Sequence, residues 1–113
     1  MRLWRWGYDK FDTGYRIFTL AYSRWLGFDC YLFHYPTGSF IPKHKDPAKF
    51  GPHYRFNIEL VKAKKGGEFL CKEMIFSLRN RIHFFRADDS YHQVTKIEEG
   101  SRWVLSFGFT LKK

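Results

Sequence analysis

A histidine and an aspartate two positions apart, His44 and Asp46, have the residue types and spacing of metal ligands. On an extended backbone, side chains two positions apart leave the same face, so both can contact one ion. A His-x-Asp pair alone is weak evidence, because it arises by chance in about one sequence in four of this composition. The pair needs a third ligand from elsewhere in the chain.

His92 is the third ligand that we predict, because it lies on a late strand that would close a barrel. Two histidines and one carboxylate leave one face of an octahedron open, and iron that must bind oxygen needs that open face. Zinc more often takes a closed set of four ligands. The sequence therefore predicts an iron site made of His44, Asp46 and His92.

Arg102 stands ten residues after His92, at the start of the last predicted strand. Along that strand, residues alternate between two different faces. One face is large and apolar, with Trp103, Leu105, Phe107, Phe109 and Leu111, and the other is small apart from the arginine, with Arg102, Val104, Ser106, Gly108 and Thr110. Small residues around one guanidinium form a pocket that can hold a carboxylate through two hydrogen bonds.

Short strands are the elements that would position these residues. Aromatic and branched residues bounded by Gly, Pro and Asp predict strands at about 15–22, 29–35, 54–62, 67–71, 74–77, 81–85, 91–97 and 101–111. A hairpin is expected over 62–69, with Gly66 and Gly67 supplying positive φ at its tip. About eight or nine strands separated by turns favour an all-β sandwich or barrel, and an iron site between two sheets makes it a jelly roll.

Length and composition indicate one folded domain. The chain has 113 residues, of which 44% are hydrophobic and 21% aromatic, too apolar for disorder. No apolar run is long enough to span a bilayer, and the start does not read as a signal peptide, so a soluble intracellular protein is expected. Cys30 and Cys71 are predicted to be reduced core residues.

The formal charge of +9 predicts attraction to anions, from a small dianion to nucleic acid. Lys43, Lys45 and Lys49 flank the metal motif and would surround its entrance with positive charge. They would either draw in an anionic ligand or only keep the rim soluble, and both interpretations stay open.

The motifs together resemble a known family, the Fe(II)- and 2-oxoglutarate-dependent dioxygenases, particularly the prolyl-4-hydroxylase-like branch. The resemblance covers about residues 30–111. Its elements, in chain order, are Tyr35-x-x-Gly38, His44-x-Asp46, Gly66-Gly67-Glu68, Phe84-Phe85, His92-Gln93-Val94 and Gly100-Ser101-Arg102. Each element is short, and their order and spacing carry the specificity.

The resemblance implies a double-stranded β-helix, the jelly roll of cupin-like proteins, in a minimal version with few or no helices. Residues 29–111 would form this core and residues 1–28 an N-terminal cover. Because padding helices are missing, the row from Trp103 to Phe109 needs either the N-terminal aromatics or a second subunit to cover it, and a homodimer is one expectation.

The resemblance also implies the site. His44, Asp46 and His92 would bind Fe(II), Arg102 would pair with the distal carboxylate of 2-oxoglutarate, and Tyr35 would contact this cosubstrate. O2 would be the second cosubstrate, with ascorbate as a candidate reductant. The 2-oxo acid would be decarboxylated to succinate while a prime substrate is hydroxylated, with a prolyl residue of a peptide or protein as the best guess. A carboxylate at position 46, instead of Gly or Ala, implies hydroxylation and not halogenation.

Three positions weaken the detailed match. Ile41 stands where many members of the family have a tyrosine that contacts the cosubstrate. Tyr35 also has an alternative interpretation as a core aromatic, and Asn57 is a weaker candidate for the pocket because its strand alternates between an inner and an outer face.

Two other classes of protein remain open. A basic, aromatic β-barrel could bind single-stranded nucleic acid by stacking and phosphate contacts, although this gives the candidate ligands no joint purpose. A cupin-type metal protein with another activity, such as an isomerase, would keep the ligands but leave Arg102 unexplained.

Overall fold

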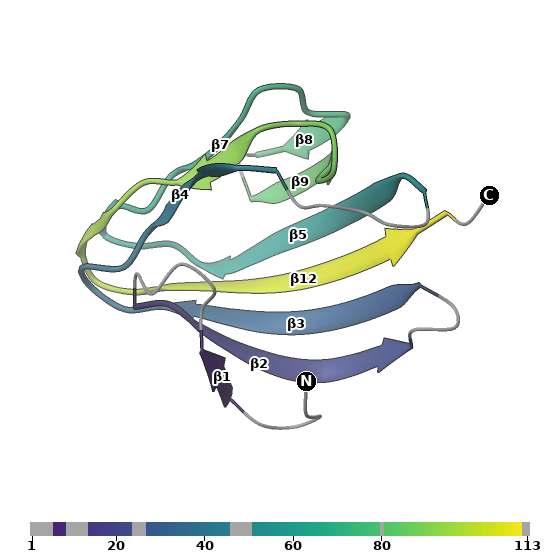
Figure 1. Ribbon diagram of the computed structural model, residues 1–113. Coiled ribbons are helices and arrows are strands. Elements are labelled where there is room, and N and C mark those ends of the chain that lie inside the picture. Colours follow the sequence, from purple (N-terminus) through teal and green to yellow (C-terminus); the bar gives the residue numbers. More distant parts are fainter. Residues whose placement is uncertain (1–5, 9–13, 24–26, 46–50, 80, 112–113) are drawn as a thin grey trace.

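The last strand of the chain, β12 (Arg102–Thr110), lies near the middle of a seven-stranded antiparallel sheet. A computed structural model describes residues 6–8, 14–23, 27–45, 51–79 and 81–111, and these residues contain twelve strands and no helix (Figure 1). The order across the large sheet is β1 (Trp6–Tyr8), β2 (Arg16–Ser23), β3 (Phe28–Tyr35), β12, β5 (His53–Val61), β9 (Ile82–Arg86) and β8 (Phe76–Leu78). The predicted all-β class is confirmed for this part of the chain.

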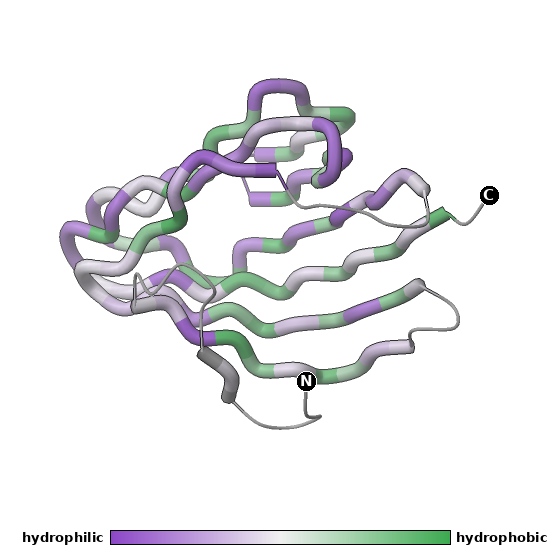
Figure 2. The backbone as a smooth tube through the Cα atoms, viewed as in Figure 1, coloured by the Kyte–Doolittle hydropathy of each residue, from purple (hydrophilic) through white to green (hydrophobic). Residues whose placement is uncertain are grey.

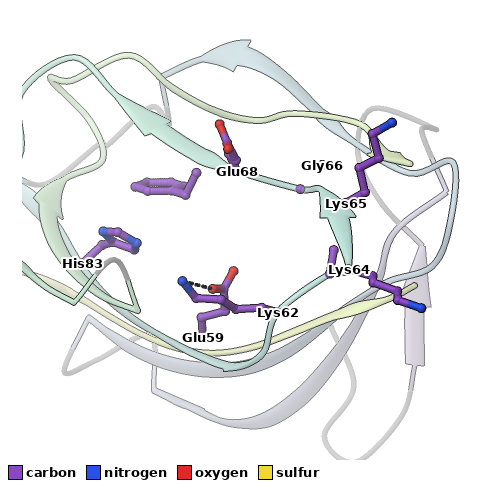
Figure 3. A pocket seen from close by; sticks show the side chains of 10 residues that line it. Glu59, Lys62, Lys64, Lys65, Gly66, Glu68 and His83 are labelled. Atoms are coloured by element: carbon purple, nitrogen blue, oxygen red, sulfur yellow. Dashed lines mark ion pairs between the residues drawn. The ribbon is translucent and has the colours of Figure 1, made fainter. Parts of the chain in front are cut away.

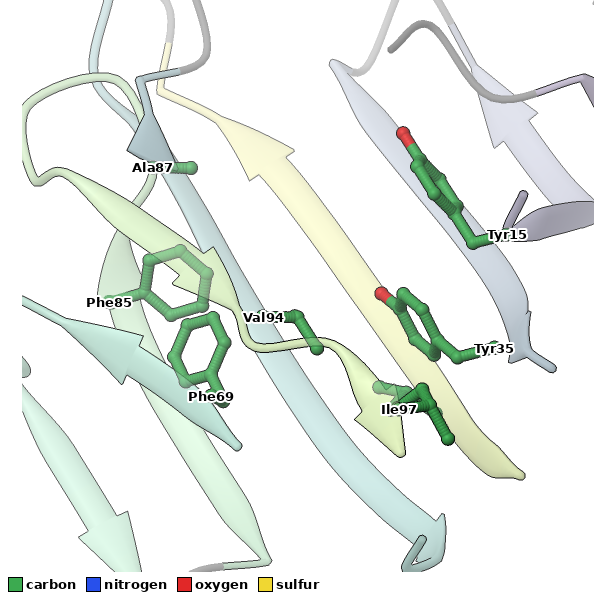
Figure 4. Close-up of a cluster of buried hydrophobic side chains, with 8 residues drawn as sticks. Tyr15, Tyr35, Phe69, Phe85, Ala87, Val94 and Ile97 are labelled. Atoms are coloured by element: carbon green, nitrogen blue, oxygen red, sulfur yellow. The ribbon is translucent and has the colours of Figure 1, made fainter. Parts of the chain in front are cut away.

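The remaining strands are shorter. A three-stranded antiparallel sheet has the order β4 (Ile41–His44), β10 (His92–Val94) and β7 (Phe69–Cys71), and β11 (Ile97–Glu99) pairs with β6 (Lys65–Gly66). One buried cluster contains Tyr35 and Val104 from the large sheet together with Phe69 and Val94 from the three-stranded sheet (Figure 4). The two sheets therefore face each other across the core.

The predicted strand pair near the N-terminus is present. It corresponds to β2 and β3, which pair antiparallel, with Ile17 opposite Phe33. Residues 16–23, which belong to the predicted N-terminal cover, thus extend the large sheet. Within the described residues no helix is long and apolar enough to cross a membrane.

Strand β12 has the predicted alternation, and its small-residue face is the inner one. Arg102, Val104 and Ser106 are at most 1% exposed, whereas Trp103 and Leu105 between them are only partly buried. Figure 2 shows the matching alternation of hydropathy along the strands of the large sheet. The small side chains therefore leave room inside the protein for the polar groups of neighbouring strands.

The outer face of the large sheet is rich in aromatic rings. The Tyr54 ring lies 5.4 Å from that of Phe109 and 5.8 Å from that of Phe84, and Phe56 lies 6.2 Å from Phe84. Coverage of this face by N-terminal aromatics stays a prediction, because residues 1–5 and 9–13 lie outside the described residues.

The predicted hairpin over 62–69 is wrong. Strand β5 belongs to the large sheet, whereas β6 pairs with β11 and β7 with β10, so this segment crosses between sheets. Gly66 and Gly67 do have positive φ, 77° and 66°. A Cβ on Gly66 would collide with the backbone carbonyl of Lys96, and one on Gly67 with the Ile97 side chain. Gly66 therefore permits close approach of the Lys96 backbone, and Gly67 leaves room for the Ile97 side chain, instead of the two forming a hairpin tip.

Gly108 makes room for an ion pair between buried Arg55 and partly buried Asp29. The Arg55 guanidinium donates to the Asp29 carboxylate over 2.5 Å, and both groups lie over the Gly108 backbone. A Cβ at position 108 would overlap both. This inner position of β12 is thus restricted to glycine by space, since its φ is not positive.

We expect Gly108→Ala to destabilise the protein by about 1–3 kcal/mol, because the new methyl group must displace the Arg55–Asp29 pair. Urea unfolding measures this free energy. Gly7→Ala is the matched control, since its Cβ would meet only the Ile17 carbonyl oxygen at 3.7 Å. Equal stability of Gly108→Ala and the parent would contradict the packing described for Arg55.

Candidate functional site

His44 and His92 lie opposite each other on neighbouring strands. His44 ends β4 and His92 begins β10, and their Cα atoms are register partners. Their imidazole ring centroids are 4.3 Å apart with an interplanar angle of 57°. The structure therefore brings together two of the three predicted metal ligands, 48 positions apart in sequence.

Both imidazoles are oriented by the backbone two residues before them. The His44 Nδ1 lies 2.8 Å from the Pro42 carbonyl oxygen, and the His92 Nδ1 lies 2.9 Å from the Ser90 carbonyl oxygen. A carbonyl oxygen can only accept, so each Nδ1 is the donor, and in the neutral imidazole the lone pair is on Nε2. Metal-binding histidines are commonly held by a second hydrogen bond of this kind.

Aromatic rings surround His92. Its ring centroid lies 4.9 Å from that of Phe85 and 6.2 Å from that of Phe69, and the residue is 7% exposed. An apolar wall on this side excludes water and limits the directions from which a third ligand can approach the histidine pair.

Asp46 lies outside the described residues, so its predicted role as the carboxylate ligand stays a prediction. Among the residues that the structure describes, no group of three His, Cys, Asp or Glu side chains is placed to hold a metal ion. The two imidazoles nevertheless fit the predicted donor set, because their lone pairs are assigned to Nε2 by hydrogen bonding.

Arg102 contacts a carboxylate, and that carboxylate belongs to the protein. Its Nε donates to Glu59 Oε2 over 2.5 Å, and Arg102 and Glu59 are 1% and 8% exposed. Glu59 Oε1 also lies 4.0 Å from the Lys62 ammonium group. The predicted anion pocket at Arg102 is therefore filled on one side by Glu59.

Tyr35 packs on the other side of Arg102. The guanidinium carbon lies 4.9 Å from the centre of the Tyr35 ring, and the tyrosine is 3% exposed. Burial raises the pKa of the Tyr35 hydroxyl, which Arg102 partly opposes. The phenol is thus neutral near pH 7. Ile41, at the position of the missing tyrosine, packs against the buried cluster.

A second polar cluster follows the inner face of the large sheet. Arg55 donates to Ser106 Oγ over 2.5 Å, and that hydroxyl donates to Asn57 Oδ1 over 2.5 Å. Asn57 therefore lies on the inner face of the sheet, where a residue of the predicted pocket has to lie. Sequence reasoning missed Arg55 and Glu59, although both share the phase of Asn57 along β5.

Two of the cavities lined by described residues lie at different ends of these clusters. One, of about 330 Å³, is lined by Glu59, Lys62, Ala63, Lys64, Lys65, Gly66, Gly67, Glu68, Phe69 and His83 (Figure 3). The other, of about 300 Å³, is lined by Tyr22, Ser23, Gly27, Phe28, Asp29, Tyr31, His53 and Thr110. The first cavity adjoins the Glu59 carboxylate that contacts Arg102.

Other histidines, the lysines beside His44 and the two cysteines lie around these groups. His83 is 2% exposed, and His53 Nδ1 lies 2.9 Å from the Thr110 hydroxyl. Lys43 and Lys45 place their ammonium groups 5.3 and 4.4 Å from the centre of the Tyr91 ring. Both cysteines are free, with Cys30 buried and Cys71 only partly so.

Comparison with known proteins gives little beyond the fold. No family model and no curated protein matches the chain. A solved structure of Rhodobacter sphaeroides SigE in complex with the anti-sigma ChrR is similar, with 18% identity and a TM-score of 0.53. The match covers 93% of this chain and 48% of that chain, so this chain spans about half the length of its structural neighbour. At this identity the likeness concerns the fold alone.

His83 should make stability depend on pH. Burial, followed by the charge of Arg102, lowers the pKa of its imidazole from the ordinary value of 6.5. The unfolded chain then takes up a proton more readily than the folded one, so stability is present above about pH 6.5 and is lost as the pH falls below it.

We expect the free energy of unfolding of the parent protein to fall between pH 7.5 and 5.5, and to fall less in His83→Gln. Urea unfolding at the two pH values measures the difference. Met74→Leu is the control, because the Met74 sulfur lies 3.1 Å from His83 Nδ1 and its replacement alters the packing there without removing an ionisable group. The free energy of unfolding of this variant should depend on pH as it does in the parent. If the free energy of unfolding of His83→Gln depends on pH as strongly as that of the parent, groups other than His83 cause the loss of stability at low pH.

Proposed function

We propose that this chain is a non-haem iron oxygenase that couples the oxidative decarboxylation of 2-oxoglutarate to the hydroxylation of a prime substrate. The observation that carries the proposal is the His44–His92 pair, with ring centroids 4.3 Å apart and each Nδ1 held by a backbone carbonyl. With Asp46 two residues after His44, the chain can supply two imidazoles and one carboxylate, which is the donor set of oxygen-binding iron.

We also propose that the two facing sheets form a double-stranded β-helix. Its support is the path of the chain: β3, β5, β9 and β12 belong to the large sheet, whereas β4, β7 and β10 belong to the small one. The chain thus passes repeatedly from one sheet to the other, as the winding of a jelly roll requires. In this fold the histidine pair lies on the inner face of the small sheet.

Each candidate residue has a role that follows from its contacts. His44 and His92 would present neutral Nε2 atoms to the ion, and Asp46 would offset part of its charge. The aromatic wall of Phe69 and Phe85 would keep water from one side of the pair. Iron, when bound, supplies the redox chemistry by which O2 converts 2-oxoglutarate to succinate and carbon dioxide and oxidises the prime substrate.

Arg102 would hold the distal carboxylate of 2-oxoglutarate. Its guanidinium is buried, already contacts one carboxylate, and has the Tyr35 ring 4.9 Å away. Tyr35 would fix the guanidinium plane, which a bidentate contact to a carboxylate needs. The prime substrate that we propose, on the resemblance to prolyl hydroxylases, is a prolyl residue of a peptide or protein.

Binding of single-stranded nucleic acid is a second candidate function. One observation favours it: Lys43 and Lys45 flank His44, and both ammonium groups lie over the ring of Tyr91, which is 41% exposed. A partly exposed tyrosine beside two lysines can stack on a base while the lysines contact phosphates. This role needs neither the histidine pair nor Arg102.

The proposed oxygenase makes a direct spectroscopic prediction. Anaerobic addition of Fe(II) and then 2-oxoglutarate should produce a weak visible charge-transfer band, because the 2-oxo acid chelates the bound iron. We expect His44→Ala and His92→Ala to lose this band, since each removes one ligand. Visible absorption and equilibrium dialysis of Fe(II) measure the two steps.

His53→Ala is the matched control, because His53 contacts Thr110 in the other cavity and should keep the band. A parent protein that binds no Fe(II) and shows no band would contradict the oxygenase. An affinity for nucleic acid that falls steeply with salt and does not change when metal is added would then favour binding of single-stranded nucleic acid.

A further inference from the structure

The Glu59 carboxylate is hydrogen-bonded to the Arg102 guanidinium, the group that an acid ligand would need. Its Oε2 is 2.5 Å from Arg102 Nε, and the two residues are 8% and 1% exposed. A single buried positive charge is thereby already balanced inside the protein. Adding a second carboxylate beside an unmoved Glu59 would bury two negative charges against one positive charge, which is unfavourable where water is excluded.

Glu59 has another cation within reach. The Lys62 ammonium group lies 4.0 Å from Glu59 Oε1, and its side chain is 40% exposed. Both residues line the cavity of about 330 Å³, and Figure 3 shows their charged ends meeting inside it. The cavity thus offers space next to Glu59, and Lys62 offers a second ion-pair partner at its edge.

Arg102 and Glu59 differ in the space that surrounds them. The stem of Arg102 packs near Gly67, where an added Cβ would lie 3.5 Å from Arg102 Cδ, and the guanidinium faces the Tyr35 ring. Glu59 instead adjoins the cavity. If one partner of the pair moves, Glu59 is the one with room to do so.

We propose that Glu59 competes with the acid cosubstrate for Arg102, and that Lys62 takes over the Glu59 carboxylate when the cosubstrate binds. The inference rests on the proposed function, because it assigns the acid to the Arg102 site. Opening the internal pair reduces the apparent affinity for any 2-oxo acid with a distal carboxylate. A 2-oxo acid without that second carboxylate has no need of Arg102 and avoids this cost. Glu59 therefore determines how strongly the site prefers a dicarboxylate.

The test uses the full chain loaded with Mn(II), which is redox-inert here, and titrates it with 2-oxoglutarate and with 2-oxobutyrate in a calorimeter. We expect Glu59→Gln to bind 2-oxoglutarate about tenfold or more tightly than the parent, and 2-oxobutyrate within about twofold. Glutamine keeps an oxygen that can accept from Arg102 but removes the competing charge. Thermal unfolding should show a larger stabilisation by 2-oxoglutarate in this variant than in the parent.

Lys62→Met gives a second, independent measurement. Its side chain is partly exposed, so the fold should survive even if Glu59→Gln does not fold. We expect this variant to bind 2-oxoglutarate about threefold or more weakly, because Glu59 loses its alternative partner. Lys64→Met is the matched control, because Lys64 lines the same cavity but pairs with Glu99, at 3.6 Å. The affinity of this variant for 2-oxoglutarate should equal that of the parent.

Three results would count against the inference, and they differ in what else they overturn. If the parent binds 2-oxoglutarate and Glu59→Gln binds it equally or more weakly, Glu59 is no competitor and the oxygenase still stands. If Lys62→Met and Lys64→Met behave alike, the transfer to Lys62 is wrong. If neither the parent nor Glu59→Gln binds 2-oxoglutarate although Mn(II) binds, the cosubstrate assignment fails and the inference fails with it.

Discussion

The structure depends on two buried arginine charges of the large sheet, which must be paired there. Among the described residues, Arg102 pairs with Glu59 and Arg55 with Asp29, each with a 2.5 Å contact. An unpaired buried charge costs several kcal/mol, so both pairs restrict which side chains β3, β5 and β12 can carry on their inner faces. The small residues of β12 follow from the same requirement, since Gly108 leaves the space that Arg55 and Asp29 occupy.

Part of this arrangement could be predicted from the sequence. The alternation along 101–111 was sufficient to place Arg102 among small residues, and β12 has this pattern with Arg102 fully buried. Period-2 alternation does not say which face is inside, however. Along β5 the inner face holds Arg55, Asn57 and Glu59, while the outer one is aromatic. The partner of Arg102 was missed because a glutamate in a strand normally faces water.

The histidine pair shows a different limit of sequence reasoning. Residue type and chain order suggested that His44 and His92 act together, but their contact depends on the register between β4 and β10, which is a long-range property. The hairpin over 62–69 failed for a related reason. Gly66 and Gly67 have the positive φ of a turn, yet they are required by close contact with Lys96 and Ile97, and no local pattern indicates such a contact.

The proposed oxygenase requires that His44 and His92 bind one metal ion through their Nε2 atoms. Anomalous diffraction from crystals of the full chain soaked with Fe(II) under anaerobic conditions tests this requirement without relying on activity. We expect one strong iron peak about 2.1 Å from the Nε2 atoms of both histidines, with a carboxylate oxygen of Asp46 as a third ligand. An iron peak elsewhere, or imidazoles that keep their positions with no iron between them, would contradict it.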